Sequence, residues 1–166
     1  MTSPTGAIFS DCRRYRYVLW RVWDDEKATI NFIGLNPSTA DETTDDPTMR
    51  RCRQFARDWG YGGFLMTNLF AFRATEPAQL KIANDPVGAE NDKWISQAAK
   101  DADRIIFVWG AHGSFRNRDK EVTMLLGGNA YCLSLTKAGQ PGHPLYLKRS
   151  LLPVEFPGKR IARVRS

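Results

Sequence analysis

The chain has 166 residues, of which 42% are hydrophobic, and its five tryptophans and nine phenylalanines exclude a disordered protein. This length suits one domain with one core, so we expect a single domain over residues 1–166. No apolar run reaches the roughly 20 residues that span a bilayer, and the first residues lack the basic and then apolar order of a signal peptide. The sequence therefore predicts a cytoplasmic monomer without a membrane partner.

The net charge of +6 is concentrated near the two ends of the chain, where we expect basic surface and a basic tail over 153–166. Clustered lysine and arginine favour nucleic acid or another polyanion as a partner. The alternative is solvated charge that only keeps the protein soluble. The basic residues of these two segments are Arg13, Arg14, Arg16, Arg21, Lys148, Arg149, Lys159, Arg160, Arg163 and Arg165.

The three cysteines, Cys12, Cys52 and Cys132, are odd in number and far apart in the chain. They form no CxxC pair, which argues against a disulfide framework and against a structural zinc site. We interpret them as buried or incidental thiols and expect no cofactor.

The elements predicted first are strands at 15–23 and 28–35, which a turn at 24–27 joins into a hairpin. A helix over 47–63 follows, because its apolar residues recur at helical spacing and glycines end it. Strands and helices then alternate. The remaining predicted elements are a strand at 64–72, a short helix at 76–82, a helix at 87–102, a strand at 104–110, a helix at 115–126, a strand at 129–135, a loop at 136–148 and a weak helix at 146–152.

This alternation predicts an α/β fold, a three-layer α/β/α sandwich with a mostly parallel central sheet and an N-terminal hairpin. In such sheets ligands bind beyond the carboxyl ends of the strands. Four loops leave those ends, and they begin at Asn36, near Asn68, at Gly110 and near Thr136. We expect the functional site among these four loops.

Amide side chains lie at the ends of two predicted strands. Asn36 precedes Pro37, which favours an extended conformation, and its amide can hold a water molecule or cap a turn. Asn68 lies within an apolar strand, where an unpaired amide is unfavourable. It can recognise the edge of a nucleobase on which Phe70 or Phe72 stacks, or it can bond to the backbone while both phenylalanines pack in the core.

His143 lies on a loop stiffened by glycine and proline, where it can donate a hydrogen bond to developing negative charge. Apolar residues that suit insertion between bases follow it, beside basic residues that suit phosphates. The alternative is a loop histidine whose apolar neighbours fold back onto the core. The candidate nucleic-acid contacts are Leu145, Tyr146, Lys148 and Arg149, with Arg116 and Arg118 from the segment after the strand at 104–110.

An acidic segment, residues 41–46, follows the first of these loops and contains Asp41, Glu42, Asp45 and Asp46. Carboxylates so close to a DNA site repel phosphates unless they are paired. One interpretation is a solvated loop in which Asp45 or Asp46 caps the helix at Pro47. The alternative is a divalent metal site built from Asp41, Asp45 and Asp46.

The strings GLNPS, TNLFAFRAT, RIIFVWG and GHPLYL, in this order over residues 30–150, resemble motifs of the uracil-DNA glycosylase superfamily. The resemblance implies that Asn36 positions the attacking water, that Asn68 recognises a flipped base and that His143 stabilises the departing base. It implies a DNA glycosylase-like fold and the removal of a deaminated, damaged or modified base. The base-binding residues it implies are Gly34, Leu35, Pro37, Ser38, Asn68 and Phe70.

The chain as a whole more closely resembles family 1643 of the domains of unknown function, through the strings NPSTAD, DDPT, NLFA, RAT and HPLY. That family implies no activity. Two alternatives to the glycosylase hypothesis therefore stay open. One is a nucleotide- or nucleic-acid-binding protein without catalysis, and the other is a metal-assisted nucleotide hydrolase that uses the acidic segment.

Overall fold

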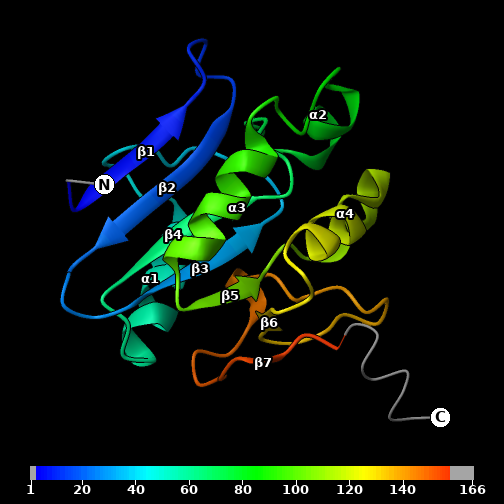
Figure 1. Cartoon of the computed structure of the whole chain (residues 1–166). Helices are drawn as coiled ribbons and strands as arrows, with labels where there is room; N and C mark the ends of the chain where they lie inside the picture. The colour runs from blue at the N-terminus through cyan, green and yellow to red at the C-terminus, as the bar shows by residue number, and fades with distance from the viewer. Residues whose placement is uncertain (1–2, 158–166) are drawn as a thin grey trace.

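The computed structural model describes residues 3–157, which form a seven-stranded sheet flanked by helices (Figure 1). The order of the strands across the sheet is β1-β2-β4-β3-β5-β6-β7. The strands are β1 (Thr5–Phe9), β2 (Arg16–Val22), β3 (Thr29–Gly34), β4 (Gly63–Asn68), β5 (Arg104–Phe107), β6 (Tyr131–Cys132) and β7 (Val154–Glu155). The helices are α1 (Pro47–Asp58), α2 (Pro77–Ile82), α3 (Asn91–Asp101) and α4 (Arg118–Leu125), with 3-10 helices η1 (Ala111–Asn117) and η2 (Pro144–Tyr146).

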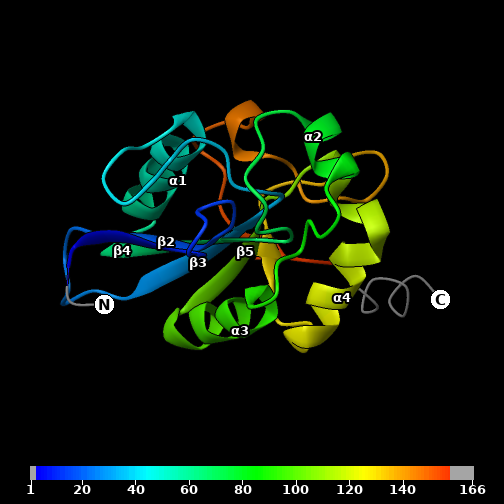
Figure 2. The ribbon, with the colours of Figure 1, turned by 90° about the horizontal axis from the view of Figure 1, so that it is seen from above.

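The middle of the sheet is parallel and its edges are antiparallel. Strands β4, β3, β5 and β6 run in parallel, whereas β1 and β2 on one side and β7 on the other are antiparallel to their neighbours. Helix α1 covers one face of the sheet, and α3 and α4 cover the other (Figure 2). The predicted α/β class with helices on both faces of the sheet is confirmed, whereas the sheet predicted to be mostly parallel has as many antiparallel as parallel pairings among the described strands.

The central strands are apolar on both faces because helices cover both faces. All six residues of β4 are buried, and so are five of the six in β3. Phe55 of α1 packs with Phe32 and Phe64 in one cluster, and Ile95 of α3 packs with Phe107 in a second. Two separate apolar layers therefore hold the central strands and fix where their carboxyl ends lie.

The predicted pairing of the strands at 15–23 and 28–35 is wrong. β4 lies between β2 and β3, and the N-terminal hairpin joins β2 to β1 instead. Neighbouring strands lie about 4.8 Å apart, so the connection 23–28 has the length to cross one intervening strand. A central position is needed to bury both faces of β4. The short connection between β2 and β3 gives no sign that β4 lies between them.

Several predicted boundaries differ from the structure. The strand predicted at 129–135 forms ladder bonds only at Tyr131–Cys132, and the weak helix at 146–152 is replaced by η2. Within the basic tail predicted over 153–166, the strand Val154–Glu155 pairs with β6. The tail residues Lys159, Arg160, Arg163 and Arg165 lie outside the described residues.

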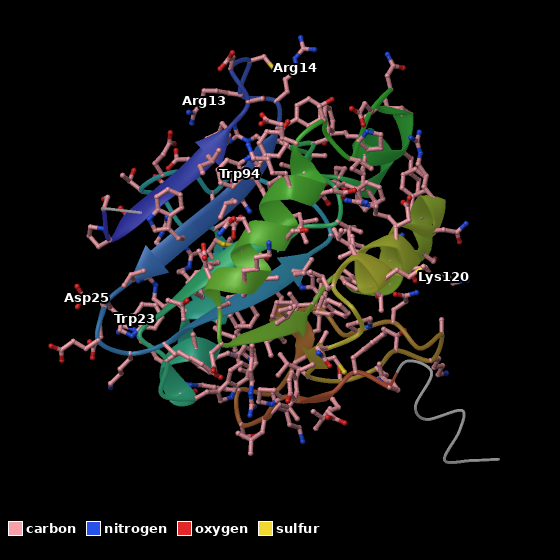
Figure 3. The ribbon with its side chains drawn as sticks, viewed as in Figure 1. Arg13, Arg14, Trp23, Asp25, Trp94 and Lys120 are labelled. Carbon is pink, nitrogen blue, oxygen red and sulfur yellow. The ribbon has the colours of Figure 1, made fainter. Side chains whose placement is uncertain are left out.

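Two arginines expected on a basic surface, Arg16 and Arg21, are buried in β2, and each is only 1% exposed. Arg13 and Arg14 lie in the turn before β2, at the opposite end of this strand from Trp23 and Asp25 (Figure 3).

Within residues 3–157, the helices are too short and too polar to cross a membrane.

Candidate functional site

A pocket of about 740 Å³ lies at the carboxyl edge of the parallel strands. All four loops that the sequence placed at this edge contribute to it, through Asn36, Asn68, Gly110 and Thr136. The start of β2 also reaches it, because β2 runs antiparallel to β4 and begins where β4 ends. The volume is within the range of small-molecule sites, about 300–1,000 Å³.

Asn36 is half-buried in the wall of this pocket, and its amide orientation is fixed by two carbonyl groups. Its Nδ2 donates to the carbonyl oxygens of Pro37 at 3.0 Å and of Ala74 at 2.8 Å. Both amide protons are therefore used, and Oδ1 is the group that remains. An oxygen held in this way can accept a hydrogen bond from water.

Asn68 ends β4 and is 4% exposed. Its Oδ1 accepts a long hydrogen bond of 3.4 Å from Nη2 of Arg16, and its Nδ2 has no acceptor among the described residues. A Cβ at Gly34 would stand 2.9 Å from this Nδ2, which is too close for a side chain. Gly34 thus leaves room for the amide, which offers donors to a ligand.

His143 begins the short 3-10 helix η2, and its Nδ1 accepts from the backbone N–H of Leu145 at 3.3 Å. The neutral ring therefore carries its proton on Nε2. Burial lowers the pKa of His143 below its ordinary value of 6.5, against the opposing effect of Asp46. Near neutral pH the side chain is thus an uncharged donor.

Two charged side chains line the pocket, of which Asp46 was expected beside the site and Arg16 was not. Among the described residues, Arg16 is the only lysine or arginine in the lining and Asp46 the only carboxylate. The Oδ1 of Asp46 accepts from the N–H of Met49 at 2.9 Å and caps α1, whereas its Oδ2 has no hydrogen-bond partner in residues 3–157. The cap was a stated alternative from the sequence. Burial lowers the pKa of both Arg16 and His143, and the negative charge of Asp46 opposes this change in each group.

Other predicted residues lie in the same pocket or at its rim. Leu145 and Tyr146 are exposed, at 41% and 84%, on the η2 loop, and the ring of Tyr146 lies 5.6 Å from that of His143. They offer the apolar tip that the sequence predicted. Further lining residues are Gly34, Leu35, Pro37, Ser38 and His112.

Some predicted site residues lie elsewhere. Phe70 is fully buried, packs against Phe115 and does not line the pocket, so the prediction that it stacks on a base is wrong. Arg118 is also buried, where it donates to Leu69 O and pairs with Asp92, so it is no phosphate contact. Three further predicted DNA contacts, Arg116, Lys148 and Arg149, are exposed outside the pocket, and Arg149 pairs with Asp58.

The acidic segment 41–46 is structural. Asp41 accepts from the backbone N–H groups of Thr43 and Thr44. Glu42 pairs with Arg13 at 2.9 Å, and Asp45 pairs with both Arg21 and Arg53. These partners hold the pKa of Asp41, Glu42 and Asp45 below the ordinary values.

The alternative of a metal site at Asp41, Asp45 and Asp46 is therefore wrong. Each carboxylate has its own donor, and residues 3–157 contain no group of three or more acidic, histidine or cysteine side chains that could hold a metal ion. Arginines pair with Glu42 and Asp45, and backbone N–H groups bind Asp41, so these three carboxylates have partners and none of them lines the neighbouring pocket.

Comparison with known proteins places the chain in one family. It belongs to the family described as protein of unknown function (DUF1643), whose model matches residues 16–145. No curated protein and no solved structure matches the chain. The family suggested by the sequence is confirmed, whereas the relationship to the uracil-DNA glycosylases gains no support from these comparisons and stays a hypothesis.

Proposed function

We propose that this DUF1643 protein hydrolyses the N-glycosidic bond of a deaminated, damaged or modified base in DNA. The observation that carries the proposal is that Asn36, Asn68 and His143 line a single pocket, although they come from the end of β4 and from two loops far apart in the sequence. Their free groups are one acceptor and two donors, a set that suits a water molecule and the edge of a base.

The attack on the sugar is assigned to water held by Asn36. Its Oδ1 is the amide group that the carbonyls of Pro37 and Ala74 leave free. Asp46 supplies the only carboxylate of the pocket among the described residues, and its Oδ2 is free to take the proton of this water. The oxygen of the water then bonds to C1′ of the sugar as the bond from C1′ to the base breaks.

The electron pair of the broken bond leaves with the base, and the charge spreads over its ring and carbonyl oxygens. His143 would donate its Nε2 hydrogen to one of these oxygens, which favours departure of the base. The neutral state of His143 suits this role, because a donor that keeps its proton stabilises the anion without an acid step. The base takes up a proton from solvent after it leaves.

DNA is the proposed partner because the exposed tip of the η2 loop lies beside the pocket. A base inside a duplex reaches an enclosed site only after it has flipped out of the stack. Leu145 and Tyr146 are apolar and exposed at the rim, where they can fill the gap that the base leaves.

The test is the release of free base from duplex and single-stranded oligonucleotides that carry uracil, hypoxanthine or modified pyrimidines. We expect abasic sites with at least one substrate, in the presence of a chelator. Asn36→Ala and His143→Ala should each slow the reaction about 10²–10³-fold, the usual effect of removing one such group. Phe115→Leu, which changes a residue outside the pocket, is the matched control.

Tight binding of DNA without release of any base would overturn the catalytic proposal and favour the binding protein. Loss of activity in the presence of a chelator would also contradict the proposal, because the proposed mechanism uses no metal ion. Unchanged rates for Asn36→Ala and His143→Ala would show that catalysis takes place elsewhere.

A further inference from the structure

Arg16 is the unexplained group of the pocket. It starts β2, is 1% exposed and lines the pocket beside Asn68. An arginine has five N–H donors, and only two of those in Arg16 have acceptors within residues 3–157. Nη1 donates to Ala40 O at 3.1 Å and Nη2 to Asn68 Oδ1 at 3.4 Å, while the buried Nε has no partner.

The charge of Arg16 also lacks an ion pair within the described residues. Asp46 attracts it without a salt bridge, and Arg73 and Arg21 add positive charge nearby. Burial is the main reason that the pKa of Arg16 falls to about 10. The side chain still carries its charge at neutral pH, and a buried charge without a partner is costly to keep. A partner that arrives with a ligand would remove this cost.

The contact between Arg16 and Asn68 restricts what this ligand can be. Because Arg16 donates to Oδ1 of Asn68, the Nδ2 donors are left on the side of Gly34, which also lines the pocket, and they have no acceptor among the described residues. His143, which also lines the pocket, adds a third N–H donor at Nε2. A ligand that fits must therefore present hydrogen-bond acceptors. The acceptor that binds the guanidinium group of Arg16 should be an anionic oxygen, because a charge-assisted hydrogen bond is the strongest.

We propose that the pocket selects a nucleotide with an anionic oxygen group, and that Arg16 binds this group on the base itself, as in a pyrimidine that carries a carboxylate. This inference rests on the proposed function, since it assumes that Asn68 faces the base. Arg16 contacts Asn68 directly, which places its charge at the base end of the pocket. The volume of about 740 Å³ leaves room for a substituted base.

The experiment compares three ligands by calorimetric titration of the full chain. 5-Carboxydeoxyuridine places the anion on the base, deoxyuridine 5′-monophosphate places it on the sugar phosphate, and deoxyuridine has neither. We expect the wild-type protein to bind the carboxylated nucleoside at least tenfold more tightly than deoxyuridine. Arg16→Met should abolish this difference, and Arg16→Lys should restore part of it.

Arg14→Met, which removes an exposed arginine, should leave the preference unchanged. A melting curve for each variant separates loss of binding from loss of folding. A preference of the wild type for the monophosphate that depends on Arg16 would overturn the assignment to the base. Equal affinity for the three ligands, or a preference that survives in Arg16→Met, would overturn the inference. Base release measured in parallel tests the proposed function, so either proposal can fail alone.

Discussion

Two arginines on the same strand are buried to the same extent but have different surroundings. Arg21, near the end of β2, donates from Nε to Asp45 and from its other nitrogens to five backbone carbonyl groups. Arg16, at the start of β2, has two acceptors and an unpartnered Nε. The protein itself supplies the charge partner and the hydrogen-bond acceptors of Arg21. Arg16 lies at a pocket, and the described residues supply acceptors for only part of its guanidinium group.

The difference explains why a basic protein carries an acidic segment next to its candidate site. Residues 41–46 wrap around Arg21, and three of their backbone carbonyls and the carboxylate of Asp45 bind it. The segment then passes to Asp46, which caps α1 and closes one wall of the pocket. A structural role at Arg21 thus positions a chemical group beside Arg16.

The largest expected effect is at Arg21. Arg21→Met leaves several buried carbonyls and part of the charge of Asp45 without a partner, so we expect the free energy of unfolding to fall by about 3–5 kcal/mol. Urea unfolding followed by circular dichroism measures it. Arg14→Met, at an exposed position, should stay within about 0.5 kcal/mol of wild type. Equal losses in the two variants would show that the network around Arg21 does not stabilise the fold.

A smaller effect is expected at Asp46, which ends the acidic segment around Arg21 and lines the pocket that contains Arg16. Asp46→Ala removes the cap of α1 and should lower the free energy of unfolding by about 1 kcal/mol. Asp46→Asn keeps a capping oxygen, so it should retain most of this stability while it slows base release. Thermal unfolding of the two variants, with activity measured on the same samples, tests this separation. Equal stability losses would assign Asp46 a role beyond the cap.

The smallest effect is the pH dependence due to His143. Its folded pKa lies below its ordinary value of 6.5, so the unfolded chain binds more protons than the folded one between these two values. Stability contributed by the neutral ring is therefore complete above pH 6.5 and is lost as the pH falls towards the folded pKa. His143→Gln should flatten this part of the curve of unfolding free energy against pH. A curve that His143→Gln leaves unchanged would contradict the burial of a neutral ring.

Much of the fold could be predicted because the alternation of apolar strands and amphipathic helices is local information. The carboxyl-edge loops at Asn36, Asn68 and Gly110 follow from it, and the structure brings these loops to one pocket. The strand order could not be predicted, since the insertion of β4 between β2 and β3 depends on tertiary packing. The hairpin was therefore assigned to the wrong pair of strands.

The sequence could not predict which arginine lies in the site. Arg16 and Arg21 have the same residue type in the same strand, and composition places both on a basic surface. Only the structure shows that both are buried and that Arg16 has no ion pair in the part of the chain that it describes. Phe70 illustrates the reverse case, because an aromatic residue two positions after Asn68 suited stacking, but packing placed it in the core.

If Arg16 is kept without an ion pair so that it can bind a ligand, its removal should not destabilise the fold, and urea unfolding of Arg16→Met beside Arg21→Met measures this. Removal of a buried charge without an ion pair relieves its desolvation, and this gain offsets the loss of two hydrogen bonds. We therefore predict that Arg16→Met unfolds at a urea midpoint equal to or above that of wild type, while Arg21→Met unfolds far below it. A loss of stability in Arg16→Met as large as that in Arg21→Met would contradict the claim and make both arginines structural.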